Sequence, residues 1–254
     1  MAITKSPGLV LQRIAFGDTS LILKVYTADH GLITLIAKGA KTPKSKFRAL
    51  VDFFLVLQWV YPSGGRGEIW TLHDASLMED LPHIRRQPVK QALGQVWLEA
   101  YLRLSPGAGE AAQRFDWLAQ HLQSLDAAEG QADLNRLSID FMVGFCHLSG
   151  YAPQFRVCIH CGESVEDPRL RMHMELGGPV CRACRKPGEA TVALSREAAR
   201  LIERCEESGW LCAAPSQIHV QAAETFLWSF LHRHAGEGHR LKALDIYREM
   251  TSEG

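Results

Sequence analysis

The stretch Ile36–Tyr61, IAKGAKTPKSKFRALVDFFLVLQWVY, joins a basic first half to an apolar, aromatic second half. The first half contains no acidic residue and five basic ones, Lys38, Lys41, Lys44, Lys46 and Arg48. Gly39 and Pro43 disfavour a regular helix or strand, so we expect a mobile loop there. The second half is rich in β-branched and aromatic side chains, which predicts a strand. A cationic loop beside such a strand would suit a phosphate backbone with unstacked bases, whereas a solvated loop beside a core strand is the alternative.

Four further segments around this stretch have the pattern of short strands. Leu21–Tyr26 alternates between two faces, and the segments 9–14, 32–37 and 68–72 are flanked by turn residues. The sequence PSGGRG at 62–67 is a strong turn signal before the last of them. Five short strands, with 53–60 as the fourth, favour a closed barrel because closure removes exposed strand edges. We expect an OB-fold, a small barrel that binds single strands, with an SH3-like barrel as the alternative.

From residue 81 onward the apolar residues recur at three- and four-residue steps, which predicts helices. The expected helices cover residues 89–104, 111–125, 134–148, 195–205, 223–231 and 241–250. Ser195 is the expected N-cap of the fourth helix. The fold class is therefore α+β. We expect two domains, a five-stranded OB-fold at 1–80 and a mainly helical domain at 81–254, with an inserted cysteine module at about 154–190.

Four of the seven cysteines form two C-x-x-C pairs inside the helical part. Cys158 and Cys161 are separated from Cys181 and Cys184 by 19 residues, a spacing typical of a four-cysteine zinc site. Two residues between cysteines let one tight turn direct both sulfurs at one ion, and two such turns complete a tetrahedron. Because four thiolates leave no position for water, we expect a structural Zn²⁺ ion. The alternatives are a pair of disulfides and a degenerate relic of a metal site.

The rest of the sequence shows binding chemistry rather than catalytic chemistry. It contains no glycine-rich phosphate loop, no G-x-S-x-G turn and no HExxH helix, so we expect no enzymatic activity. His160 and His173 could replace a metal ligand, but we expect them at the surface. The chain has 28 basic and 28 acidic residues, so a nucleic-acid site must be a local patch. We expect no signal peptide and no membrane-spanning segment, and hence a soluble, intracellular protein.

Three groups of residues resemble the RecO family of bacterial recombination and DNA-repair proteins. The first comprises GDTS at 17–20, Gly31-Leu32, and AKGAK at 37–41. The second is LSGYAP at 148–153, which leads into Cys158-x-x-Cys161-Gly162, and the third is RLKAL at 240–244. Together these matches extend over most of the chain.

This resemblance implies an OB-fold followed by a helical domain with a zinc module. It implies a non-enzymatic mediator that binds single- and double-stranded DNA, anneals complementary strands and, with RecR, helps to load recombinase onto DNA covered by single-strand-binding protein. The acidic, apolar tail of single-strand-binding protein would bind a pocket in the helical domain, for which Arg136 is the candidate base. The resemblance also implies a cytoplasmic, nucleoid-associated protein with no membrane partner.

The candidate nucleic-acid residues are the five basic residues of the loop, with Arg13 and Lys24 from neighbouring strands. Phe47, Trp59 and Tyr61 could stack on bases, and a core position is the alternative for each. Two other functional classes remain: an OB-fold and zinc module that binds RNA or acts in translation, and a nuclease or other nucleic-acid-modifying enzyme. Competition between DNA and RNA would separate the first from a DNA-binding protein, and turnover of labelled DNA with magnesium would reveal the second.

Overall fold

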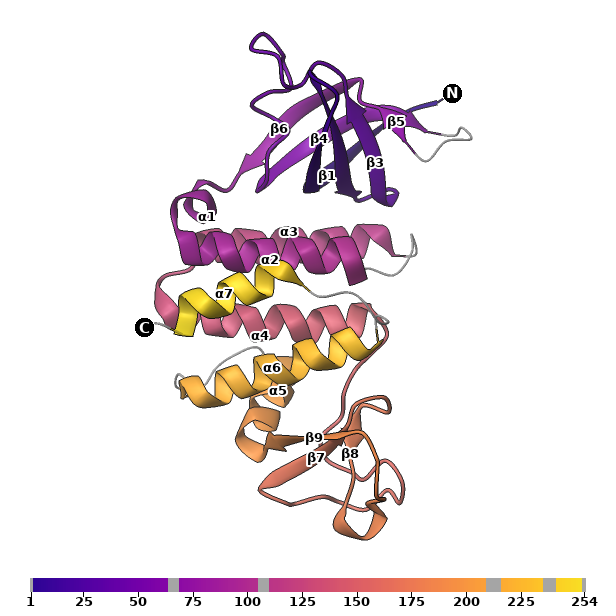
Figure 1. Cartoon of the computed structure of the whole chain (residues 1–254), viewed down its shortest axis with the longest axis vertical. Helices are drawn as coiled ribbons and strands as arrows, with labels where there is room; N and C mark the ends of the chain where they lie inside the picture. Colours follow the sequence, from indigo (N-terminus) through magenta and orange to yellow (C-terminus); the bar gives the residue numbers. More distant parts are fainter. Residues whose placement is uncertain (1, 64–68, 105–109, 209–215, 235–240, 253–254) are drawn as a thin grey trace. The chain divides into compact units, whose positions relative to one another are not determined.

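The computed structural model describes residues 2–63, 69–104, 110–208, 216–234 and 241–252. Most of the predicted turn at 62–67, and Arg240 of the third motif, lie outside these residues. The chain forms two compact units, one made of Met1–Ala128 with Leu241–Gly254 and the other of Glu129–Arg240. An N-terminal sheet followed mainly by helices makes the protein α+β, as predicted (Figure 1).

The first unit begins with a six-stranded sheet whose strand order is β5-β3-β2-β1-β4-β6. Its strands are β1 (Ala2–Phe16), β2 (Ser20–Thr27), β3 (Gly31–Ala37), β4 (Leu55–Ser63), β5 (Trp70–Thr71) and β6 (Asp74–Asp80). Neighbouring strands are antiparallel except β3 and β5, which are parallel. Tight turns join the first three strands, so their pairing is local and their alternating pattern is readable in the sequence.

Strand β1 is longer than predicted because its two halves pair with different neighbours. Residues 2–9 pair with β4, whereas residues 8–16 pair with β2. Gly8 lies where the two pairings overlap, and a Cβ there would come within 2.9 Å of the Trp59 ring and 2.8 Å of the Tyr26 carbonyl oxygen. Only glycine fits at this position, because any side chain would collide with the backbone of β2.

The predicted closed five-stranded barrel is not found, because β5 and β6 are separate edge strands that do not pair with each other. Between β5 and β6 the backbone switches its hydrogen-bonding partner from β3 to β4. The N–H of Leu72 donates to the Ile36 carbonyl in β3 (3.0 Å), and the N–H of His73 donates to the Val60 carbonyl in β4 (2.9 Å). The strand predicted at 68–72 therefore shrinks to two residues, and β6 is an additional strand on the opposite edge.

One side of the sheet encloses an apolar core. Buried side chains of the strands in this core include Val10, Leu23, Val25, Leu35 and Leu57. The segment between β3 and β4, which the sequence predicts as a loop, contributes Ala40, Phe47 and Val51 to the same core. The loop is therefore part of the folded domain and not only a connection between two strands.

The described part of the first unit also contains the helices α1 (Pro82–Arg86), α2 (Pro88–Leu104), α3 (Ala111–Ala127) and α7 (Lys242–Ser252). The Tyr26 ring of β2 packs edge-on against Tyr101 of α2, with 5.2 Å between the ring centroids. The Tyr101 hydroxyl donates to the Arg114 carbonyl of α3 (2.8 Å), and burial raises the pKa of Tyr101 above its usual value. These contacts join the sheet to α2 and α3.

Asp126, near the end of α3, connects α3 to α1 and α2. Its carboxylate accepts the N–H of Ile84 in α1 (2.8 Å) and lies 2.8 Å from Nδ1 of His83. Its carbonyl accepts a hydrogen bond from the ammonium of Lys90 in α2 (2.8 Å), a lysine that is almost fully buried. The residue before α1 forms no side-chain cap. The carboxylate of Asp126, which belongs to a different helix, therefore accepts one of the N–H groups left without a partner at the start of α1.

Replacing Asp126 by alanine should lower the free energy of unfolding of the first unit by about 1–2 kcal/mol, because the buried N–H of Ile84 loses its acceptor. Urea unfolding followed by circular dichroism measures this change. Asp116→Ala is the matched control, since Asp116 is exposed on the same helix. Equal losses of stability in the two variants would contradict the capping role.

The described residues of the second unit form three helices and a small sheet. Its helices are α4 (Gly130–Leu148), α5 (Arg196–Ser208) and α6 (Gln217–His234), and they pack against one another. Its sheet has the order β8-β7-β9, with strands β7 (Arg169–His173), β8 (Gly178–Pro179) and β9 (Thr191–Ser195). The Ser195 hydroxyl accepts the N–H of Ala198 (3.2 Å), which confirms the predicted N-cap of α5. No helix in the described part of the chain is both long and apolar enough to span a bilayer.

Candidate nucleic-acid interface and metal centre

The basic segment between β3 and β4, residues 38–54, is a series of turns anchored to the sheet, whereas the sequence predicts a mobile loop. The N–H of Lys41 donates to the Thr19 carbonyl (2.8 Å), and the N–H of Gly39 donates to Ser20 Oγ (3.3 Å). Phe47, in the middle of the segment, is buried in the core. The backbone of the segment therefore lies against the β1–β2 turn.

Two of the seven candidate nucleic-acid residues form ion pairs. Nη1 of Arg13 lies 2.6 Å from Asp52 Oδ1, and the same guanidinium lies over the Phe53 ring. Nζ of Lys46 lies 2.7 Å from Asp74 Oδ1, and this hydrogen bond lowers the pKa of the Asp74 carboxyl. A phosphate would have to displace a carboxylate to reach either cation, so these two residues are the weaker candidates.

The other five candidates form no ion pair with any carboxylate of the described residues: Lys24, Lys38, Lys41, Lys44 and Arg48. Nζ of Lys24 donates to Thr34 Oγ1 (2.9 Å), and Nζ of Lys41 donates to the Gly17 carbonyl (3.3 Å). The other three side chains are exposed. Neutral oxygen partners leave the positive charges uncompensated, so a phosphate could approach these five residues without displacing an acid.

The three aromatic residues considered for base stacking lie in the core. Trp59 and Tyr61 are 0% exposed, and Phe47 is 8% exposed. The Tyr61 hydroxyl lies 2.9 Å from His30 Nδ1, and burial raises the pKa of Tyr61. None of the three can reach a base, so the core interpretation is confirmed. Sequence reasoning missed Phe16, which is 52% exposed; its position directly before a glycine turn is the signal that points to it.

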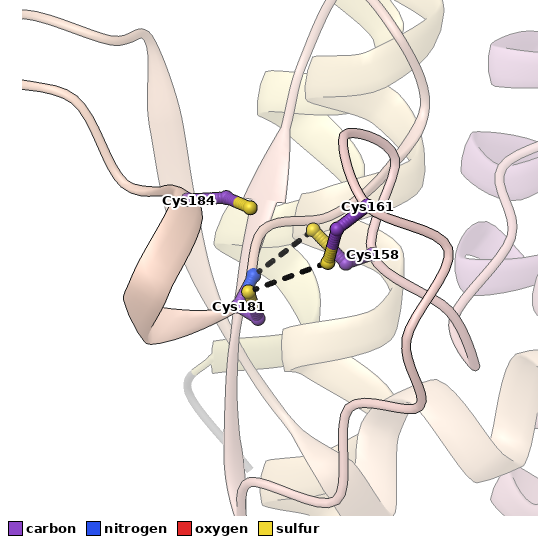
Figure 2. Close-up of side chains that lie close together, drawn as sticks. All are labelled: Cys158, Cys161, Cys181 and Cys184. Carbon is purple, nitrogen blue, oxygen red and sulfur yellow. Dashed lines mark hydrogen bonds between the residues drawn. The ribbon is translucent and has the colours of Figure 1, made fainter.

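The cysteine module of the second unit places both C-x-x-C pairs at tight turns. Gly162 ends the first turn with a φ of +76°, which favours glycine, and its N–H donates to the Cys158 carbonyl (2.9 Å). The second pair flanks and ends the 3₁₀ turn η1 (Arg182–Cys184), in which the N–H of Cys184 donates to the Cys181 carbonyl (3.1 Å). Both turns direct their sulfur atoms to the same place (Figure 2).

The four sulfur atoms lie close enough together to share one ion. All are within 4.8 Å of one another, and the Sγ atoms of Cys161 and Cys181 are 3.8 Å apart. Tetrahedral bonds of about 2.3 Å to zinc require sulfur–sulfur distances of about 3.8 Å. A disulfide bond would be about 2.0 Å long, so no disulfide joins these four cysteines and the disulfide alternative is wrong. The cluster fits a four-coordinate ion.

Cys158 is the thiol of this cluster whose ionisation is favoured. Burial opposes ionisation, but the backbone N–H groups of Cys181, Cys161 and His160 lower the pKa of Cys158 to about 6. The neighbouring thiols of Cys181 and Cys161 raise the pKa of Cys184 to about 12. Thiolates at this separation repel one another strongly, so all four can be charged together only around a cation.

His160 and His173 face Glu189 instead of the four sulfur atoms. Their Nε2 atoms lie 2.8 Å and 3.8 Å from Glu189 Oε1, and the hydrogen bond from His160 lowers the pKa of the Glu189 carboxyl. Nδ1 of His173 accepts the N–H groups of Glu175 and Leu176, which leaves Nε2 as the protonated nitrogen. Neither histidine belongs to the sulfur cluster, so the alternative in which one replaces a thiolate finds no support.

Arg136, the candidate base for the tail of single-strand-binding protein, is half-buried on α4 of the second unit. Asp140 follows one turn later on the same helix. A pocket of about 370 Å³ in the first unit is lined by Phe53 and by residues of α2 and α7. Arg136 is not part of the lining of this pocket, and its role in partner binding stays a prediction.

Two family models match the chain. The model described as Recombination protein O N terminal matches residues 1–80, and the model described as Recombination protein O C terminal matches residues 85–244. The two matches divide near the point where the strands of the first unit end and its helices begin.

Curated proteins named DNA repair protein RecO are similar to this chain over most of their length. The protein of an Exiguobacterium species is 29% identical over 198 residues, which cover 78% of this chain and 76% of the relative. The protein of Streptomyces griseus is 27% identical over 247 residues, covering 94% and 97%. The protein of Pelobacter propionicus is 27% identical over 253 residues, covering 98% of each chain.

Proposed function

The chain belongs to the RecO family of DNA repair proteins, and from this we propose that it is a non-enzymatic recombination mediator. In this proposal it binds single- and double-stranded DNA, anneals complementary strands and, together with RecR, helps to load recombinase onto DNA covered by single-strand-binding protein. The observation that carries the proposal is a group of five basic side chains that form no ion pair with a carboxylate among the described residues: Lys24 on β2, and Lys38, Lys41, Lys44 and Arg48 in the 38–54 segment.

We propose that the sheet of the first unit works as an OB-fold, although its edges are not closed by strand pairing. Strand β1 pairs with both β2 and β4, and β3 pairs with β5 in parallel. The chain between β5 and β6 forms hydrogen bonds with both β3 and β4, which lie on opposite sides of the β2–β1 pair. This arrangement supports a barrel-like enclosure of the core, and a barrel of this type presents one face and its loops to a single strand.

Annealing needs no chemical step by the protein. Pairing of complementary strands is favourable by about 1.4 kcal/mol per base-pair step, and what opposes the encounter is repulsion between two polyanions. Basic side chains without carboxylate partners reduce this repulsion when they bind phosphates. The proposed role of Lys38, Lys41, Lys44 and Arg48, with Lys24 on β2, is to hold a strand while a second strand pairs with it.

We propose that the four cysteines hold a structural Zn²⁺ ion. Four thiolates complete a tetrahedral shell, so no position is left for water or substrate. The sulfur–sulfur distance of 3.8 Å between Cys161 and Cys181 supports this assignment. When bound, the ion supplies a crosslink between two turns that are 19 residues apart in the chain.

We propose that RecR and the acidic tail of single-strand-binding protein are partners of the chain, and that it acts with them at the nucleoid in the cytoplasm. Both partner assignments come from the family. Arg136 is the residue that we assign to the tail, because a positive side chain on α4 could pair with an acidic peptide.

Annealing of two complementary oligonucleotides, one with a fluorophore and one with a quencher, tests this proposal. The purified chain should accelerate quenching without any nucleotide triphosphate. Strands covered by single-strand-binding protein should also anneal, and deletion of the acidic tail of that protein should abolish the second effect only. Tighter binding to RNA than to DNA, cleavage of labelled DNA with magnesium, or no acceleration on naked strands would contradict the proposal.

A further inference from the structure

The outer face of β1, β2 and β3 carries a row of apolar side chains that the core does not use. The strand register places Ile14 opposite Ile22 and Ile22 opposite Ile36, and it places Phe16 opposite Ser20 in the next row. Residues that alternate with these, such as Leu21, Leu23 and Leu35, are buried in the core. Because side chains alternate between the two faces of a strand, the row points away from the core.

Among the described residues, helices cover one end of this outer face. Tyr26, further along β2 on the same face, is 1% exposed because it packs against Tyr101 of α2. At the other end Ile14 is 42% exposed and Phe16 is 52% exposed. About half of the Phe16 side chain is therefore open to solvent and accessible to a ligand.

Three lysines lie on or beside the strands that carry this row. Lys38 directly follows β3, one residue beyond the Leu21–Ala37 pair, so continuing the register would place it opposite Ser20 and about 10 Å from Phe16 across two strand spacings. The Lys41 ammonium donates a hydrogen bond to the carbonyl of Gly17, which lies in the turn that follows Phe16. Lys24 stands two residues from Ile22 on β2 and bonds to a threonine hydroxyl. None of the three lysines pairs with a carboxylate among the residues that the structure describes, and Asp18 is the acidic side chain of the turn.

We propose that Phe16 stacks on an unpaired base of single-stranded DNA while Lys38 and Lys41 bind the adjacent phosphates. Ile14 provides an apolar surface for the neighbouring base. An aromatic ring can stack only on a base whose face is open, and in a duplex both faces of each internal base are already covered. The site therefore prefers single strands, whereas the lysines alone would bind either form. This inference rests on the proposed function, and it adds that the DNA-binding site prefers single-stranded to double-stranded DNA.

Phe16→Ala tests the inference, with Leu77→Ala as the matched control, because Leu77 is 51% exposed on β6. Fluorescence anisotropy should show that Phe16→Ala weakens binding of a thymidine oligonucleotide about tenfold. The slope of log K against log salt should not change, because no phosphate contact is lost. Binding of a duplex should stay at the wild-type value, and Phe16→Tyr should restore binding of the single strand. Circular dichroism of each variant establishes that the fold is intact.

Two results would overturn the inference. One is that Phe16→Ala and Leu77→Ala bind the single strand equally well. The other is that Phe16→Ala weakens single-strand and duplex binding by the same factor, because this would show a role without stacking. Both results leave the proposed function standing as long as neutralising the lysines still lowers binding. If neutralising the lysines has no effect either, the proposed function itself fails.

Discussion

Replacing Lys38, Lys41 and Lys44 together by glutamine should weaken the binding of single-stranded DNA about a hundredfold at about 0.1 M salt. Each phosphate contact on a single strand contributes about 0.7 to the slope of log K against log salt, so three lost contacts reduce the slope by about 2. The three side chains are exposed and have no carboxylate partner among the described residues. Their loss should therefore leave the stability of the sheet unchanged.

Anisotropy titrations at several salt concentrations measure both the affinity and the slope. The matched control replaces Arg169, Arg171 and Lys186 by glutamine, which removes the same charge from exposed positions of the second unit. If binding depended only on total charge, the two triple variants would lose equal affinity. A wild-type slope in the first triple variant would show that the 38–54 segment is not the DNA-binding site.

Removal of the metal should unfold the cysteine module, the second large effect that we expect. Structural zinc contributes about 10–16 kcal/mol of apparent binding free energy in small zinc-binding domains, and much of this is folding free energy. A three-stranded sheet and short turns connect the two C-x-x-C pairs of the module. Without the ion, residues 158–184 should lose protection against amide hydrogen exchange, while β1–β4 of the first unit keep theirs.

Metal analysis of protein purified without chelators should give one zinc per chain. The double variant Cys158→Ser and Cys161→Ser should lose that zinc, because each serine removes a thiolate ligand. Cys205→Ala is the control, since Cys205 lies on α5 outside the cluster and should keep full zinc content. Clearly substoichiometric zinc in the wild type, or unchanged hydrogen exchange after complete removal of zinc, would contradict a structural role.

The cysteine cluster shows how much a short motif can determine. The pairs Cys158–Cys161 and Cys181–Cys184 each lie within one turn, and a glycine with positive φ follows the first pair. Because each turn is set by adjacent residues, the sequence was sufficient to predict that its sulfurs point together. Strands β7 and β8 lie between the two turns and bring them together. The sequence still predicted this, because a gap of 19 residues between the pairs is typical of a four-cysteine zinc site.

The nucleic-acid candidates show where local reasoning stops. The sequence indicates a run of positive charge but not which charges are neutralised, since Asp52 and Asp74 reach Arg13 and Lys46 from distant parts of the chain. The strand 53–60 is apolar on both faces, so its pattern could not show that Trp59 lies in the core. The closed barrel failed as a prediction for a similar reason, because the break between β5 and β6 depends on hydrogen bonds to two different strands.

Local spacing alone was enough to predict the α+β class, the N-cap at Ser195 and the cluster of four cysteine sulfurs, because neighbouring residues set turn, cap and helix geometry. Tertiary contacts decided which lysines remain without an acid, which aromatic side chains are buried and where the sheet ends. These features depend on pairings between residues 20 to 40 positions apart, such as Arg13 with Asp52 and Lys46 with Asp74. Such pairings arise only when the strands come together, so the sequence could not show which lysines keep their charge unpaired or that Trp59 and Tyr61 are buried.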